Sequence, residues 1–275
     1  MKINKLLSLG LISLLSVGLL AGCSQKDAAK PVTDPLKKIV VGATPVPHAE
    51  FLEFAKGKLK EKGIELEIKE FTDYVIPNKS VAEKGLDANF FQHVPYLDEY
   101  NKKNKSTLVP IGNIHAEPLA AYSNKLKSAS EIKAGMTIAI PNDLSNGTRA
   151  LKLLQKQGLI KLKDPTSANQ TERDIVENPK NLKIKALEAA LLPKILDDVD
   201  VAIINGNYAL QGKLDTKSSL FAEDIADIEK HVNVVVSRED NKDNPSLKEL
   251  VNVLKSDEAK KFLQEKYGTA VIPAK

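Results

Sequence analysis

The stretch 137–158 contains the residues best suited to bind a charged ligand. A short apolar strand pattern (138–140) leads into a polar turn and then into a helical pattern, at whose start Ser145 and Asn146 offer oxygens suited to a helix cap. The unpaired N–H groups at such a helix start favour an anion. The guanidinium of Arg149, in the first turn, could grip a carboxylate through two parallel hydrogen bonds. An exposed arginine in an ordinary strand–helix unit is the alternative.

Further aromatic, amide and imidazole side chains directly follow other apolar strand patterns. These residues are His48, Tyr74, Phe90, Phe91, His93, Asn205, Asn207 and Tyr208. In open α/β sheets the loops at the carboxyl ends of the strands lie at one edge, where ligands bind. We therefore expect several of these side chains to converge with Asn146 and Arg149. Core packing rarely needs such a set, so the pattern favours a ligand site.

Strand and helix patterns alternate along the chain and must position these residues. Strands are predicted over 39–43, 64–68, 87–90, 108–111, 118–122, 138–140, 182–186, 199–204 and 232–236. Helices are predicted over 49–62, 78–84, 95–103 and 188–196, with two more between 246 and 267. This alternation predicts an α/β fold whose sheets are covered by helices on both faces.

Composition and charge exclude several classes of function. The chain has 40 Lys and Arg against 36 Asp and Glu, and removal of a leader containing Lys2 and Lys5 leaves 38 against 36. Positive and negative charges are thus nearly equal in number and aromatic residues are few, which argues against a nucleic-acid-binding protein. No G-x-S-x-G elbow and no H-E-x-x-H motif is present, so we do not expect an enzyme.

The N-terminus has the pattern of an exported, lipid-anchored protein. A basic start precedes an apolar segment (6–20) that is too short to span a bilayer comfortably. It ends in Leu-Ala-Gly-Cys, which resembles a bacterial lipobox, and Cys23 is the only cysteine. We therefore expect a signal peptide over 1–22, lipid attachment, palmitate included, at Cys23 and a polar tether over 23–35.

Four segments together resemble the methionine-binding lipoproteins of bacterial ABC importers, the MetQ/NlpA family. They are FTDYVIPN (71–78), DANFFQHVPYLDEYN (87–101), the IPND…N..RALKLLQKQGLI pattern (140–160) and VDVAIINGNYA (199–209). The family commonly has Pro-Thr-Asn-Gly-Gly-Arg where this chain has LSNGTR (144–149). The asparagine and the arginine are retained, whereas the loop shape and the ligand preference are put in doubt.

This resemblance implies a periplasmic-binding-protein-like fold of two α/β lobes joined by two crossing hinge segments. Lobe I would combine 36–123 with 235–275, and lobe II would be 124–234. The crossings are expected near Tyr122-Ser123 and Val235-Val236. The implied protein is a monomer that carries methionine to an ABC permease and its ATPase, with no cofactor.

Roles for the site residues follow from the two adjacent charges of an amino acid, each of which needs a partner when it leaves water. Arg149 and Asn146 would take the carboxylate, and Asn205 and Asn207 would contact either charge. Tyr74, Phe90 and Phe91 would surround the side chain, and His93 would hydrogen-bond the ligand. Neighbouring side chains of an extended segment point oppositely, so one phenylalanine of the pair is expected to face the core.

Several alternatives stay open at this point. The expected ligand is free L-methionine, and a methionine-containing dipeptide such as Gly-Met, the D form or a sulfoxide could use the same anchor. A metal-binding lipoprotein is a further alternative, although the four histidines lack short ligand spacings. The Lys- and Asn-rich composition hints at a Gram-positive source.

Overall fold

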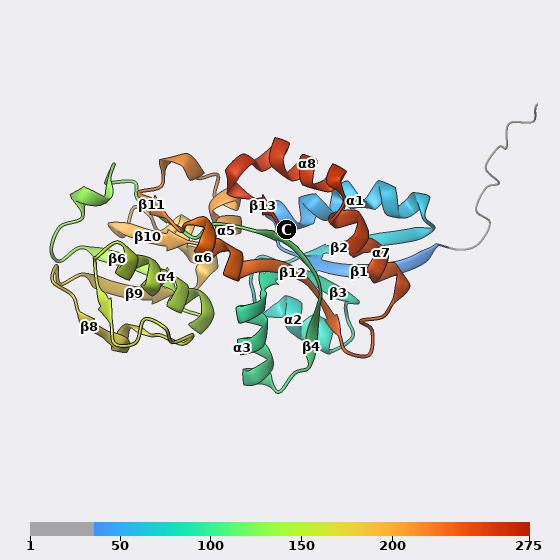
Figure 1. Ribbon diagram of the computed structural model, residues 1–275, viewed down its shortest axis with the longest axis horizontal. Helices are drawn as coiled ribbons and strands as arrows, with labels where there is room; N and C mark the ends of the chain where they lie inside the picture. The colour runs from blue at the N-terminus through green and yellow to red at the C-terminus, as the bar shows by residue number, and fades with distance from the viewer. Residues whose placement is uncertain (1–35) are drawn as a thin grey trace, which may run out of the picture. The chain divides into compact units, whose positions relative to one another are not determined.

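The strands of the protein form two mixed sheets and a small two-stranded ribbon in the computed structural model, which describes residues 36–275 (Figure 1). The first sheet has the strand order β13-β4-β12-β3-β1-β2. Its strands are β1 (Lys37–Ala43), β2 (Ile64–Glu70), β3 (Ala88–His93), β4 (Leu108–Ala116), β12 (Val232–Arg238) and β13 (Ile272–Pro273). β1 pairs in parallel with β2 and β3, whereas β12 runs antiparallel to β3 and β4.

The second sheet has the order β11-β5-β10-β6-β9. Its strands are β5 (Ala120–Tyr122), β6 (Thr137–Pro141), β9 (Lys183–Leu187), β10 (Val201–Ile204) and β11 (Phe221–Ala222), while β7 (Lys161–Leu162) and β8 (Ile175–Glu177) form the ribbon. β6 is parallel to β9 and β10, and β5 is antiparallel to β10 and β11. The sequence's prediction of an α/β fold is confirmed.

Helices cover both faces of each sheet, as their apolar patterns require. They are α1 (Glu50–Glu61), α2 (Ile76–Ala82), α3 (Val94–Asn104), α4 (Leu144–Lys156), α5 (Gly206–Gln211), α6 (Ile225–Ile228), α7 (Pro245–Leu254) and α8 (Asp257–Tyr267). α1, α7 and α8 pack on one face of the first sheet, and α2 and α3 pack on the other (Figure 1). On the second sheet α4 packs on one face, and α5 with the turn Ala189–Lys194 packs on the other.

The chain crosses from one sheet to the other twice, through segments 117–119 and 223–231. The sequence predicts the crossings near Tyr122–Ser123 and Val235–Val236, and both predicted positions lie later in the chain than the observed crossings. Tyr122 lies within β5 and Val235–Val236 lies within β12, where ladder pairing holds them inside a sheet. The crossings therefore lie in the two segments between the strands, 117–119 and 223–231, which take no part in strand pairing.

Two local predictions need correction. The segment 188–196 was expected to be an α-helix, but residues Ala189–Lys194 form a 3₁₀ turn that contains Pro193, a residue that disrupts α-helical hydrogen bonding. The sequence predicts a loop after β10, but Asn205 is the N-cap of the short helix α5 and Asn207 lies within that helix. This helix turns the side chains of Asn205 and Asn207 inward, where both are buried.

The predicted signal peptide (1–22), the lipid site Cys23 and the tether (23–35) lie outside the described residues. Within residues 36–275, no helix has both the length and the apolar character needed to cross a bilayer.

The aromatic contacts of α1 generate a stability prediction. Phe51 is fully buried and packs against the adjacent rings of Phe54 and Phe262, whose centroids lie 6.0 and 5.9 Å from its own. We expect Phe51→Ala to lower the free energy of unfolding by about 3–5 kcal/mol in urea denaturation, because it removes buried apolar area and leaves a cavity. Val176→Ala, at a 55 % exposed position, is the control and should stay within about 0.5 kcal/mol of the parent. Equal losses in the two variants would contradict the assigned core.

Candidate functional site

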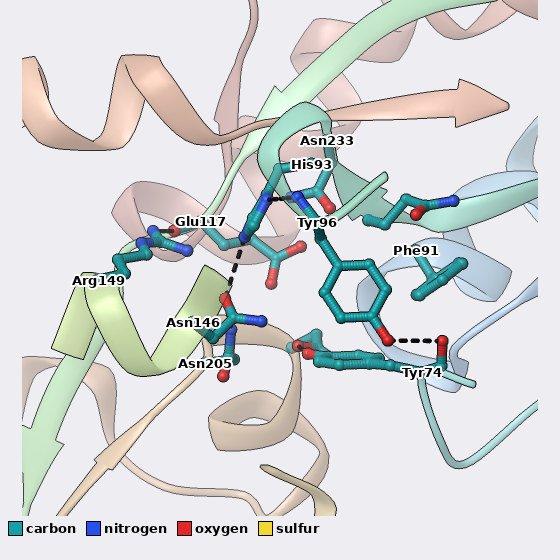
Figure 2. Close-up of a pocket in the computed structure, with 12 residues that line it drawn as sticks. Tyr74, Phe91, His93, Tyr96, Glu117, Asn146, Arg149, Asn205 and Asn233 are labelled. Carbon is teal, nitrogen blue, oxygen red and sulfur yellow. Dashed lines mark hydrogen bonds between the residues drawn. The ribbon is translucent and has the colours of Figure 1, made fainter. Parts of the chain in front are cut away.

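A crevice between the two sheets collects side chains from β3 and β12 and from the segments that follow β2, β3, β4, β6 and β10. Seven of the eight predicted ligand residues line it, and these are Tyr74, Phe91, His93, Asn146, Arg149, Asn205 and Asn207. Figure 2 shows Arg149, Asn146 and Asn205 on one side of the crevice and Phe91, Tyr96 and Tyr74 on the other. The expected convergence of loops is therefore present, and ligand binding by these residues stays a prediction.

Phe90 is the predicted residue that does not line the crevice. Its side chain is fully buried in the core under α1, with its ring centroid 4.7 Å from that of His48. Phe91, the next residue of β3, points the other way and lies 5.6 Å from the ring of Tyr74. The alternation of side chains along a strand explains why only one of the pair reaches the crevice.

The start of α4 is set by Asp143, not by the residues expected to cap it. The Asp143 carboxylate accepts a hydrogen bond of 2.8 Å from the backbone N–H of Asn146, and the two side chains are also hydrogen-bonded. Ser145 and Asn146 therefore lie within the first helical turn. The cap uses the backbone N–H and Nδ2 of Asn146, so its Oδ1 atom is directed away from Asp143 and toward the crevice.

Arg149 is fixed by an ion pair that the sequence did not predict. Its Nε and Nη2 atoms donate to the two carboxylate oxygens of Glu223 at 2.6 and 2.5 Å, and Nη2 also donates to the backbone carbonyl of Glu117 at 2.7 Å. Both side chains are nearly fully buried. The two-bond grip that we expected on a ligand carboxylate is thus made on Glu223, because a buried guanidinium needs a counter-charge. Nη1 has no hydrogen bond to any residue of the described part.

A chain of hydrogen bonds links His93, Asn146 and Asn205 across the crevice. The Nδ1 atom of His93 accepts from the backbone N–H of Tyr96, so Nε2 carries the proton and donates to Asn146 Oδ1 at 3.0 Å. Asn205 Nδ2 donates to the same oxygen at 2.9 Å. Burial lowers the pKa of His93 to about 3, so the ring is neutral near pH 7. His93 therefore orients Asn146 instead of offering a free nitrogen to a ligand.

Two buried amide atoms that line the crevice lack any partner among the described residues. They are the acceptor Asn205 Oδ1 and the donor Asn207 Nδ2. The orientation of Asn207 is fixed because its Oδ1 accepts from the Tyr74 hydroxyl at 2.5 Å, and that of Asn205 is fixed by its bond to Asn146. Buried polar atoms are nearly always paired in proteins. One orphaned acceptor and one orphaned donor in the same crevice therefore indicate a small polar ligand with both kinds of group.

Sequence reasoning missed five residues that line the crevice, namely Gln92, Tyr96, Glu117, Gly206 and Asn233. Glu117 lies in a crossing segment, and Gln92 and Asn233 lie within strands, so no loop pattern marks them. Gly206 carried a signal, since it stands in the Asn-Gly-Asn sequence after β10. A Cβ atom there would lie 2.6 Å from Cβ of Glu117, so the close approach of these two segments requires glycine.

Glu117 is the second carboxylate of the site. Its side chain is 5 % exposed, and desolvation raises the pKa of its carboxyl above the usual value. His48 and His115 lie behind it, with donor atoms of all three residues within 4.8 Å of one another. A direct hydrogen bond of 2.8 Å between His115 Nε2 and Glu117 Oε1 occupies the space between them. The three form a buried cluster in which His115 is hydrogen-bonded to Glu117 and His48 Nε2 lies 3.4 Å from the same oxygen.

Comparison with known proteins now places the chain. The family model described as NlpA lipoprotein matches residues 39–275. The chain belongs to the NlpA lipoprotein family. Among members of this family, the D-methionine-binding lipoprotein MetQ of Escherichia coli K12 is 44% identical over 243 residues, which cover 87% of each chain.

Solved structures agree with this NlpA family assignment. A nutrient binding protein of Burkholderia cenocepacia bound to methionine has a TM-score of 0.83 and 40% identity, over 86% of this chain and 100% of that one. The lipoprotein Tp32 of Treponema pallidum has a TM-score of 0.83 and 39% identity, over 86% and 99% of the two chains. The chain thus has the periplasmic-binding-protein-like fold of these NlpA relatives.

The buried ion pair generates a stability prediction that does not depend on the ligand. Glu223→Gln leaves the charge of Arg149 without its partner, and we expect a loss of about 3 kcal/mol in the free energy of unfolding, measured by urea denaturation. Glu229→Gln is the matched control, because Glu229 forms an exposed pair with Lys275 and such pairs contribute about 0–1 kcal/mol. If Glu223→Gln were as mild as this control, the pair would not be the structural anchor described above.

Proposed function

We propose that this protein captures methionine in the crevice and delivers it to an ABC importer. The orphaned acceptor and donor of Asn205 and Asn207, beside Arg149 and the carboxyl group of Glu117, carry the proposal. A zwitterionic amino acid supplies a complementary donor and acceptor. The relatives support methionine as the amino acid, since one is named as D-methionine-binding and another was solved bound to methionine.

The two charges of the ligand have separate partners in this proposal. Its carboxylate accepts from Nη1 of Arg149 and Nδ2 of Asn207, and its ammonium donates to Oδ1 of Asn205 and to the Glu117 carboxylate. Each of these four residues lines the crevice, and none of them is more than 6 % exposed. Charge-assisted hydrogen bonds in so dry a site are about twice as strong as neutral ones.

The thioether would lie among Tyr74, Phe91 and Tyr96, whose ring centroids are 5.6–5.9 Å apart. Sulfur–aromatic contacts contribute roughly 0.3–1.5 kcal/mol each. Burial of the whole side chain adds about 1.5–3 kcal/mol. This wall favours a flexible apolar side chain over a charged one.

Ligand entry requires the crevice walls to separate. The cavity has a volume of about 20 Å³, which is close to the space of a single water molecule. Direct bonds span it, from Tyr74 to Asn207 and from His93 to Asn146. We infer a hinge motion of two lobes, each built around one sheet, with the hinges in the crossing segments 117–119 and 223–231.

The cellular setting follows from the N-terminal pattern and the family together. We propose that the protein is held at the outer side of a bacterial membrane by lipid on Cys23, is monomeric, and meets the permease and ATPase of a methionine importer there. Relatives such as that of Escherichia coli come from Gram-negative bacteria, so a Gram-positive source stays a prediction. We further propose that the ligand leaves chemically unchanged.

Isothermal titration calorimetry of the purified protein with L-methionine, D-methionine and Gly-Met tests this function and ranks the three ligands. We expect the free amino acid to bind, and we expect Arg149→Lys to raise its Kd roughly thirtyfold or more. Lysine keeps a cation for Glu223 but loses the planar fork that serves two carboxylates at once, a loss of about 2 kcal/mol or more.

Arg238→Lys is the control, since Arg238 pairs with Asp240 away from the crevice, and its Kd for methionine should match that of the parent. Failure of all three ligands to bind the parent protein would refute the proposed function. An unchanged Kd in Arg149→Lys would remove Arg149 from the ligand site.

A further inference from the structure

The two histidines behind Glu117 are buried titratable groups to which the proposed function gives no role. His48 comes from the turn Pro45–Ala49 and His115 from β4, and both side chains are fully buried. Their Nε2 atoms lie 3.4 and 2.8 Å from the same carboxylate oxygen, Oε1 of Glu117. The other carboxylate oxygen faces Gly206 and the crevice side of the cluster. The histidines thus hold the carboxyl group from behind and leave its front toward the ligand.

The ring of His48 is itself held in place. Its Nδ1 atom is 2.8 Å from the hydroxyl of Thr44, and its Nε2 atom has no hydrogen-bond partner within the described residues. The ring centroids of His48 and His115 lie 5.0 Å apart. The ring of Phe90 packs against both histidine rings, and Phe51 packs against that of His115. Water is therefore excluded from the rear of Glu117.

A count of the charges around Glu117 shows that its carboxylate lacks a cation. The ionisable groups that face it are His48, His115, Arg149, Tyr74 and Tyr267, with Glu223 behind Arg149. The charge of Arg149 is already matched by Glu223 at 2.5 Å. Burial lowers the pKa of both His48 and His115 to about 3 and raises the pKa of both tyrosines, so all four are neutral near pH 7.

An ionised carboxylate without a cationic partner is costly in so buried a place even when a neutral histidine hydrogen-bonds it, and it lowers that cost by taking a proton. We propose that His48 and His115 position Glu117 in its protonated form, and that the ammonium group of the arriving ligand displaces this proton into solvent. The inference rests on the proposed capture of a free amino acid. The O–H bond of the carboxylic acid breaks, the proton leaves, and the ligand keeps all three protons of its ammonium group.

The direction of the pH dependence follows from this exchange. The carboxyl has a raised pKa in the free protein, and the ammonium favours the ionised form, so the pKa falls in the complex. Between these two values the affinity for methionine rises about tenfold per pH unit, because one proton is released per ligand bound. Above the raised pKa of the free protein the affinity levels off and no proton is released.

Calorimetry of methionine binding in pairs of buffers with different ionisation enthalpies measures the number of protons released. We expect the parent protein to approach one released proton per ligand at the acid end of a series from about pH 5 to 8, falling toward zero at the alkaline end. Glu117→Gln should bind more weakly and release no proton. The analogue 4-(methylthio)butanoate, which has no ammonium group, should also bind without proton release.

Variants of the histidines separate positioning from mere packing. His48→Gln and His115→Gln should shift the pH midpoint of proton release by half a unit or more, roughly a threefold change in the proton affinity of Glu117. Arg238→Lys is the control, since the 16 % exposed side chain of Arg238 pairs with Asp240 away from the crevice, and its midpoint should not move.

Methionine binding by the parent protein without proton release at any pH of the series would overturn the inference while leaving the proposed function intact. Zinc found at one equivalent after dialysis against a chelator would also overturn it, because the three donors would then be occupied by a metal. A parent protein that binds no methionine would instead refute the proposed function itself.

Discussion

The buried ion pair between Arg149 and Glu223 is the interaction on which the crevice depends. It joins α4 to the segment after β11, and it also holds the first crossing, because Leu119 donates to Glu223 and the carbonyl of Glu117 accepts from Arg149. A buried guanidinium matched by one carboxylate adds no net charge to the interior. What remains is one free guanidinium nitrogen and the carboxyl of Glu117, one donor and one acceptor group for a zwitterion.

The fold brings these groups together by the way in which its chain crosses between the sheets. β4 leads through Glu117 into β5, so a residue from a crossing segment lines the crevice beside residues from the elements around both sheets. Phe91 and His93 lie in β3 of the first sheet and Tyr74 follows β2, whereas Asn146 and Asn207 lie in α4 and α5, which follow β6 and β10 of the second sheet. In the proposed binding mode the ligand touches residues from both sides of the crevice, so binding would be coupled to closure of the walls.

Much of this could be predicted from sequence because it is local. The strand and helix periods give the alternating elements, and the loops after the strands give Tyr74, His93, Asn146 and Arg149. The partners of these residues are distant in sequence: Glu223 lies 74 positions from Arg149, and no pattern connects them. In two places the local sequence offered neighbouring residues for the same role, and tertiary packing determines which of them takes it. Asp143 caps α4 in preference to Ser145 or Asn146, and Phe90 faces the core in preference to Phe91.

The account makes a single geometric claim, which a crystal structure of the protein grown with methionine tests most directly. It predicts the ligand carboxylate within hydrogen-bond distance of Arg149 Nη1 and Asn207 Nδ2, the ammonium on Glu117 and Asn205 Oδ1, and the sulfur against Tyr74 and Phe91. Methionine bound elsewhere, or bound in the crevice with its carboxylate and ammonium exchanged, would contradict it.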